Sequence, residues 1–169
     1  MAATTEINLH VPARLPDDYC GDIHERLTLY KRLASGTDHD QLQAIQEEIV
    51  DRFGTTPDPV KALFDTHRLR LDGAALGVIR IDASADAIMI QFGPRPTVTP
   101  ERIIQFIQSR RDVRIAGQDK LRFTIATTTQ KDRFNKIREL LTILATPPKI
   151  PNQAAAKAMA KEQSKGWKS

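Results

Sequence analysis

The chain has 169 residues, of which 40% are hydrophobic and 27% charged, and this composition predicts one soluble globular domain with a real core. No apolar run approaches the roughly 18 residues of a membrane helix, and the N-terminus lacks the pattern of a signal peptide. The single cysteine, Cys20, excludes an internal disulfide and predicts a reducing, cytoplasmic location.

The net charge of +4 hides an uneven distribution along the chain. Residues 1–84 carry 9 basic and 14 acidic side chains, whereas residues 85–169 carry 16 basic and 7 acidic ones. Residues 148–169 alone hold five lysines and one glutamate, and without them the chain is neutral. The basic isoelectric point therefore comes from the tail, while the body can present an acidic face to a basic partner.

The first half is predicted to contain one strand and three helices. Apolar residues alternate over residues 5–11, which predicts a strand. The first helix is expected to begin at the acids Asp17, Asp18 and Asp22 and to end at Gly36. The second is expected from Thr37 or Asp38 to Gly54, and the third from Asp58, as N-cap, to about Gly77. Their predicted buried stripes are Ile23, Leu27, Tyr30 and Ala34 with Leu33 alongside; Leu42, Ile45, Ile49 and Phe53; and Val60, Leu63, Phe64, His67 and Leu71.

The second half changes to short strands and two helices. Strands are predicted over residues 78–81, 88–92, 113–115 and 121–125. Thr99 is expected to cap a short helix whose Ile103, Ile104, Phe106 and Ile107 face inward. A final helix is expected over about residues 130–145, with Phe134, Ile137, Leu140, Leu141 and Leu144 inside.

The predicted fold class is α+β: an N-terminal strand and a three-helix front half, followed by a small, mainly antiparallel sheet with two helices. The domain is expected to span residues 1–147. Residues 148–169 are interpreted as a Lys/Ala-rich, flexible tail with the lone Trp167, a solubilising extension that could also dock or touch phosphate weakly.

No sequence motif for catalysis or for metal binding is present. The chain contains no P-loop, no His-Glu-x-x-His and no Cys-x-x-Cys. Cys20 and His24 are four residues apart, but two ligands do not make a zinc site. We therefore expect no catalytic residue, no metal and no cofactor in this chain.

An acidic group on the second helix is the first candidate binding feature. Glu48 and Asp51 lie off the predicted buried stripe and three residues apart, which makes their carboxylates neighbours on an exposed face, with Glu47 nearby. A solvated helix face is one interpretation, and a docking surface for arginines is the other. Arg52, adjacent to Asp51, argues against docking because it could neutralise the face locally.

A basic group in the second half is the second candidate, and it supports an alternative function as a nucleic-acid-binding module. Its phenylalanines occupy core-type positions and leave no platform for base stacking, which favours ordinary solvated faces. The basic residues are Arg110, Arg111, Arg114, Lys120, Arg122, Lys131, Arg133, Lys136 and Arg138.

Four segments resemble one family in order and at matching spacing. They are LPDDY at residues 15–19, RLTLYKRLAS at 26–35, EIVDRFG at 48–54 and PDPV at 57–60. Together they resemble the C-terminal domain of the bacterial transcription-repair coupling factor, over roughly residues 5–145. The resemblance is strong in the first half and weaker in the sheet region.

The resemblance implies that the parent is a cytoplasmic bacterial ATP-dependent DNA translocase that displaces stalled RNA polymerase and recruits the repair protein UvrA. The modules that bind ATP and Mg²⁺, polymerase and UvrA all lie outside this chain. It implies a non-catalytic domain that covers the UvrA-binding surface of the parent's UvrB-like module until polymerase is engaged. Glu48 and Asp51 are similar to the family's carboxylates that face basic residues of that module. The implied partners are this module and, indirectly, UvrA, RNA polymerase and DNA, with no membrane.

Overall fold

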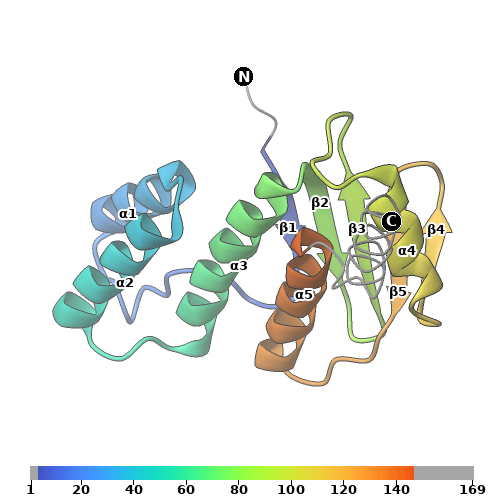
Figure 1. The fold of residues 1–169 in the computed structure, drawn as a ribbon. Coiled ribbons are helices and arrows are strands. Elements are labelled where there is room, and N and C mark those ends of the chain that lie inside the picture. Colours follow the sequence, from blue (N-terminus) through green and yellow to red (C-terminus); the bar gives the residue numbers. More distant parts are fainter. Residues whose placement is uncertain (1–3, 147–169) are drawn as a thin grey trace, which may run out of the picture.

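The strands of the computed structural model, which describes residues 4–146, form a single mixed sheet (Figure 1). The strand order is β1-β2-β3-β5-β4, with β1 parallel to β2 and every other pair antiparallel. The N-terminal strand is thus the parallel edge of the sheet formed by the second half. The strands are β1 (Glu6–Asn8), β2 (Val78–Ala83), β3 (Ala87–Phe92), β4 (Val113–Ala116) and β5 (Lys120–Thr124).

The helices occupy two places relative to the sheet. Helices α3, α4 and α5 lie along one face of the sheet, and α1 and α2 pack on the far side of α3 (Figure 1). The predicted α+β class is therefore confirmed. The helices are α1 (Ile23–Ser35), α2 (His39–Phe53), α3 (Asp58–Ala75), α4 (Pro100–Gln108) and α5 (Gln130–Ala145).

Polar side chains begin most of the helices where the sequence predicts. The side chains of Asp22, Asp38 and Thr99 each accept a hydrogen bond from a backbone N–H in the first turn of α1, α2 and α4. The predicted cap at Asp58 is wrong, because Pro57 is the extended residue before α3 and Asp58 is already helical. Asp58 still places its charge at the positive end of the helix dipole.

The buried apolar residues form two clusters, and α3 contributes to both. The helical core contains Val60, Leu63 and Phe64 of α3, and the sheet core contains Leu69 of the same helix. The rest of the helical core is Leu15, Cys20, Leu29, Leu33, Leu42, Ile45 and Ile49. The sheet core also includes Ile81, Ile88, Ile90, Phe106, Leu121, Phe123, Ile137, Leu140 and Leu144.

The predicted inward face of α1 is confirmed at Leu33 and at Tyr30, which packs against the helical core, but it is wrong at Ile23 and Leu27. Ile23 and Leu27 are 57% and 52% exposed, whereas Leu29 and Leu33 are buried against α2 and α3. Helix α1 carries apolar residues on two faces, and only one of them meets a neighbour among the described residues. Ile104 of α4 is also exposed, at 52%, because α4 packs through Phe106 on another side.

Arginine 70 of α3 binds the C-terminal end of α1. Its Nη2 donates to the carbonyl oxygens of Leu33 and Gly36, both at 3.1 Å, and its Nε donates to Nδ1 of His67 at 3.1 Å. The Leu33 carbonyl also accepts a hydrogen bond from the backbone N–H of Gly36 at 3.2 Å, so Arg70 adds a side-chain donor at this end of the helix. Burial, with the charge of Arg70 adding to it, lowers the pKa of His67 to about 4.

None of the described helices combines the length and the apolar character that crossing a membrane requires. The predicted tail, residues 148–169, lies outside the described residues.

Candidate docking surface on helix α2

The orientation of α2 is fixed by its ends and by its buried stripe. Asp38 caps the first turn, and Gly54 ends the helix with a φ of 91°, a conformation that favours glycine. Leu42, Ile45 and Ile49 are buried in the helical core. The opposite side of α2, which carries the predicted carboxylates, is therefore turned away from the core.

Glu48 lies on the flank of α2 that faces α1. Its Oε2 accepts a hydrogen bond from Nη2 of Arg32 at 2.5 Å, and its side chain remains 39% exposed. This hydrogen bond, together with the charges of Arg32 and Arg52, holds the pKa of Glu48 below its ordinary value. Glu48 is therefore a fixed, ionised carboxylate that already has one arginine partner.

Asp51 lies about one turn further along the same helix and is exposed. None of the ion pairs found within residues 4–146 involves Asp51. Glu47, also exposed, accepts a hydrogen bond from Nε2 of Gln43 at 3.3 Å. Asp51 is thus the carboxylate of the predicted pair that is free to accept a new cation.

Arg52 does not pair with Asp51. It forms an ion pair with Glu25 of α1, and its guanidinium carbon lies 4.9 Å from the centroid of the Phe53 ring. Two ion pairs join α1 to α2. Helix α1 supplies the arginine of one, Arg32 with Glu48, and the carboxylate of the other, Glu25 with Arg52. Exposed pairs of this kind are weak, so a partner that offers better geometry can replace Arg32 at Glu48.

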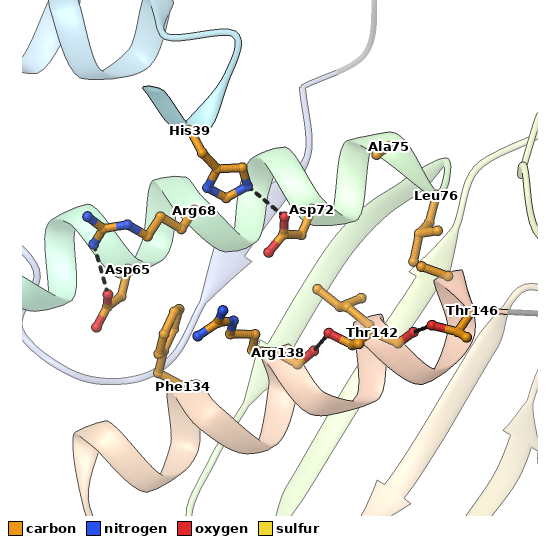
Figure 2. Close-up of a pocket in the computed structure, with 12 residues that line it drawn as sticks. His39, Asp65, Arg68, Asp72, Ala75, Leu76, Phe134, Arg138, Thr142 and Thr146 are labelled. Atoms are coloured by element: carbon orange, nitrogen blue, oxygen red, sulfur yellow. Dashed lines mark hydrogen bonds and ion pairs between the residues drawn. The ribbon is translucent and has the colours of Figure 1, made fainter. Parts of the chain in front are cut away.

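A polar groove between α3 and α5 was not predicted from the sequence. It encloses about 710 Å³ and is shown in Figure 2. Asp65 contacts Arg68 at 3.3 Å, and His39 at the start of α2 contacts Asp72 at 2.7 Å. Burial raises the pKa of Asp65, and the charge of Arg68 opposes that rise.

Both carboxylates of the groove have a partner: Asp65 pairs with Arg68 of the same helix, and Asp72 pairs with His39, which links α2 to α3. Arg138 of α5 reaches toward α3 in the same view (Figure 2). The sequence pattern identified α3 and α5 but gave no sign of the contact between His39 and Asp72, which depends on how α2 packs against α3.

The structure separates Cys20 from His24. Cys20 is completely buried, and burial raises the pKa of its thiol, whereas His24 is exposed on the first turn of α1. Within residues 4–146, no group of three or more His, Cys, Asp or Glu side chains is arranged to hold a metal ion.

The predicted basic residues do not form one surface. Arg133 is 8% exposed and structural: its Nε donates to Oγ1 of Thr127 at 2.9 Å and its Nη1 to the carbonyl oxygen of Leu9 at 2.7 Å. Arg110 pairs with Asp112 through two contacts of 2.8 Å. The remaining exposed members divide between the loop before β4 (Arg111), the sheet (Arg114, Lys120, Arg122) and α5 (Lys131, Lys136, Arg138).

Comparison with known proteins identifies the family of this chain. Residues 9–103 match the family model of the TRCF domain. The chain is 39% identical over 141 residues to the transcription-repair-coupling factor of Haemophilus influenzae, which covers 83% of this chain and 12% of that protein. It is 33% identical over 138 residues to the corresponding protein of Escherichia coli strain K12, with coverage of 81% and 12%.

The fold also matches a solved structure. The crystal structure of the C-terminal domain of a transcription-repair coupling factor superposes with a TM-score of 0.72 at 21% identity, covering 85% of this chain and 92% of that one. The chain spans about an eighth of the full-length relatives. Because the family model covers more than half of the sequence, the chain belongs to the transcription-repair coupling factor family, with the fold of its C-terminal domain.

Proposed function

We propose that this chain is a non-catalytic regulatory domain that masks the UvrA-binding surface of the UvrB-like module in its parent protein. The observation that carries the proposal is the position of Glu48 and Asp51 on one exposed side of α2, with Asp51 unpaired within residues 4–146. Fixed carboxylates of this kind are good partners for arginines on an opposing surface.

Two features of the surface suit a reversible contact. Asp51 can accept a cation without breaking any ion pair of the described chain, whereas Glu48 must share or release Arg32. The contact is electrostatic and exposed, so salt weakens it. A mask that suppresses the open state ~100-fold needs only ~2.7 kcal/mol in total, which binding of polymerase and DNA can overcome.

The catalytic parts of the parent are proposed to lie elsewhere. No P-loop occurs in this sequence, and the parent's motor is expected to supply ATP and Mg²⁺ binding. In this account the parent's engagement of RNA polymerase and DNA releases the mask, and this release exposes the UvrA site in the cytoplasm.

The experiment that tests the proposal uses the full-length parent. Replacing Glu48→Arg together with Asp51→Arg reverses the charge of the surface and should increase UvrA affinity at least tenfold in the absence of polymerase. A matched control, Asp86→Arg with Glu139→Arg, changes two exposed acids outside α2 and should leave UvrA affinity unchanged. Equal UvrA affinities for the two double variants would reject the role of α2.

A further inference from the structure

The face of the sheet opposite α3, α4 and α5 carries three cations at its β4–β5 end. Leu121 and Phe123 of β5 are buried in the sheet core, so the alternating Lys120 and Arg122 point to the other face. The register of β4 with β5 places Arg114 directly opposite Arg122. All three basic side chains are exposed.

This arrangement is unfavourable for the isolated sheet. Like charges directly opposite each other destabilise a pair of strands. None of the ion pairs within residues 4–146 involves Arg114, Lys120 or Arg122. Of the neighbouring carboxylates, Asp112 is held by Arg110 through two hydrogen bonds of 2.8 Å, and Asp119 accepts a hydrogen bond from Nε2 of Gln91 at 2.9 Å. Repulsion between the two arginines is therefore not relieved by the described part of the chain, and a bound anion would relieve it.

The neighbours of the three cations indicate what kind of anion fits. Met89 lies opposite Arg122 and Gln91 opposite Lys120 on β3, and both are half-buried. On β3, β4 and β5 this face has no aromatic side chain, and Met89 is its one large apolar group. Protein interfaces depend on buried aromatic or aliphatic anchors, whereas nucleic-acid interfaces are more polar and more positive.

We propose that this face, defined by Arg114, Lys120 and Arg122, binds the phosphate backbone of a nucleic acid without reading its sequence. Adjacent strands are about 4.8 Å apart, and alternate residues of one strand are about 6.7 Å apart. The three cations therefore present a small patch that can contact more than one phosphate of a polymer. Guanidinium groups match phosphate oxygens well, and the absence of a stacking side chain on β3, β4 and β5 predicts no preference among bases.

The test compares two double variants of the full 169-residue chain by fluorescence anisotropy with a labelled duplex oligonucleotide. Arg114→Gln with Arg122→Gln removes two cations from the face, whereas Lys131→Gln with Lys136→Gln removes two exposed cations from α5. Two lost phosphate contacts should weaken binding at least tenfold at low salt. They should also reduce the slope of log affinity against log salt by about 2, since each contact contributes about 0.9. The α5 variant should keep the slope of the unmodified chain.

Three outcomes would overturn the proposal. The unmodified chain could fail to bind the duplex, or the two double variants could lose the same amount of affinity. In the third outcome, the unmodified chain binds polyglutamate and not the duplex, and Arg114→Gln with Arg122→Gln abolishes the binding of polyglutamate. The last result would assign the face to an acidic protein. The arginine-to-glutamine variant should melt no lower than the unmodified chain, because it removes a repulsive pair. If it does melt lower, Arg114→Lys with Arg122→Lys keeps both charges and must retain the salt slope.

Discussion

The helical core and the sheet core differ in how they are built and in what their surfaces offer. The helical core has 10 buried residues, nearly all from three consecutive helices and the loop before them, whereas the sheet core has 19 from strands and helices far apart in the sequence. The acidic surface lies on the smaller, helical part and the basic surface on the sheet. The acidic first half and the basic second half of the sequence thus place their charged surfaces on two regions of the fold, the helical part and the sheet, which α3 joins. The proposed docking surface thus lies on the less extensively packed part of the domain, where local opening requires less free energy.

The largest effects should come from removing one aromatic ring from each core. Phe64→Ala and Phe123→Ala each empty a completely buried site, and each should lower the free energy of unfolding by about 3–5 kcal/mol. Hydrogen exchange should separate the two variants. Phe64→Ala should reduce protection mainly in α1 and α2, and Phe123→Ala mainly in β3 and β5. Identical exchange patterns would show that the two cores unfold as one unit.

A smaller effect is expected from loss of the polar contact between α3 and α1. Arg70→Met keeps the length of the side chain but removes its hydrogen bonds to the carbonyls of Leu33 and Gly36. The expected loss of stability is about 1.5–3 kcal/mol by urea unfolding. Arg138→Met, which changes an exposed arginine of α5, is the control and should stay within about 0.5 kcal/mol.

The pH dependence of the free energy of unfolding should reveal the contribution of His67. Its folded-state pKa of about 4 lies below its ordinary value of 6.5, so the unfolded chain binds more protons between these values. The contribution of His67 is therefore fully present above pH 6.5 and is lost as the pH falls toward 4. Because the ring is only part-buried, we expect about 1–2 kcal/mol. The measurement is urea unfolding of the unmodified chain and of His67→Gln over this range. Equal pH profiles would contradict the assignment.

The smallest effect on folding should come from the docking surface itself. Glu48→Gln and Asp51→Asn alter exposed side chains outside both cores, so the midpoint of urea unfolding should not change. The same urea measurement on Glu48→Arg with Asp51→Arg is the control for the UvrA experiment, because an unchanged midpoint there shows that a change in UvrA affinity does not come from unfolding. A clear loss of stability in either variant would mean that the pair serves the fold.

Local sequence signals predicted most of the elements. The final helix lies at residues 130–145 as expected, the cap at Thr99 is confirmed, and Asp38 is the cap of the two that were expected, because these signals act within one turn of the chain. Of the acids expected at the start of the first helix, Asp22 is the cap. The face of α1 was not predictable in the same way. Its apolar residues occupy two sides of the helix, and only the positions of α2 and α3 decide which side is covered.

The details of both surfaces depend on tertiary arrangement. The spacing of Glu48 and Asp51 predicted that they lie off the core, but the pairing of Glu48 with Arg32 required the relative placement of two helices. The basic residues were all visible in the sequence. The register that aligns Arg114 with Arg122, and the burial of Arg133, were not, because strand pairing and long-range hydrogen bonds leave no local pattern.

The most direct test of the masking account is a cross-link from α2 to the UvrB-like module in the full-length parent. A photo-cross-linker attached through Asp51→Cys should react with that module in the resting protein, and the cross-link should decrease when polymerase and DNA are bound. The same reagent attached through Glu139→Cys on α5, which is also exposed, provides the control. The account predicts peptides of the UvrB-like module joined to position 51 and not to position 139. No cross-link from position 51, or the same yield from both positions, would contradict it.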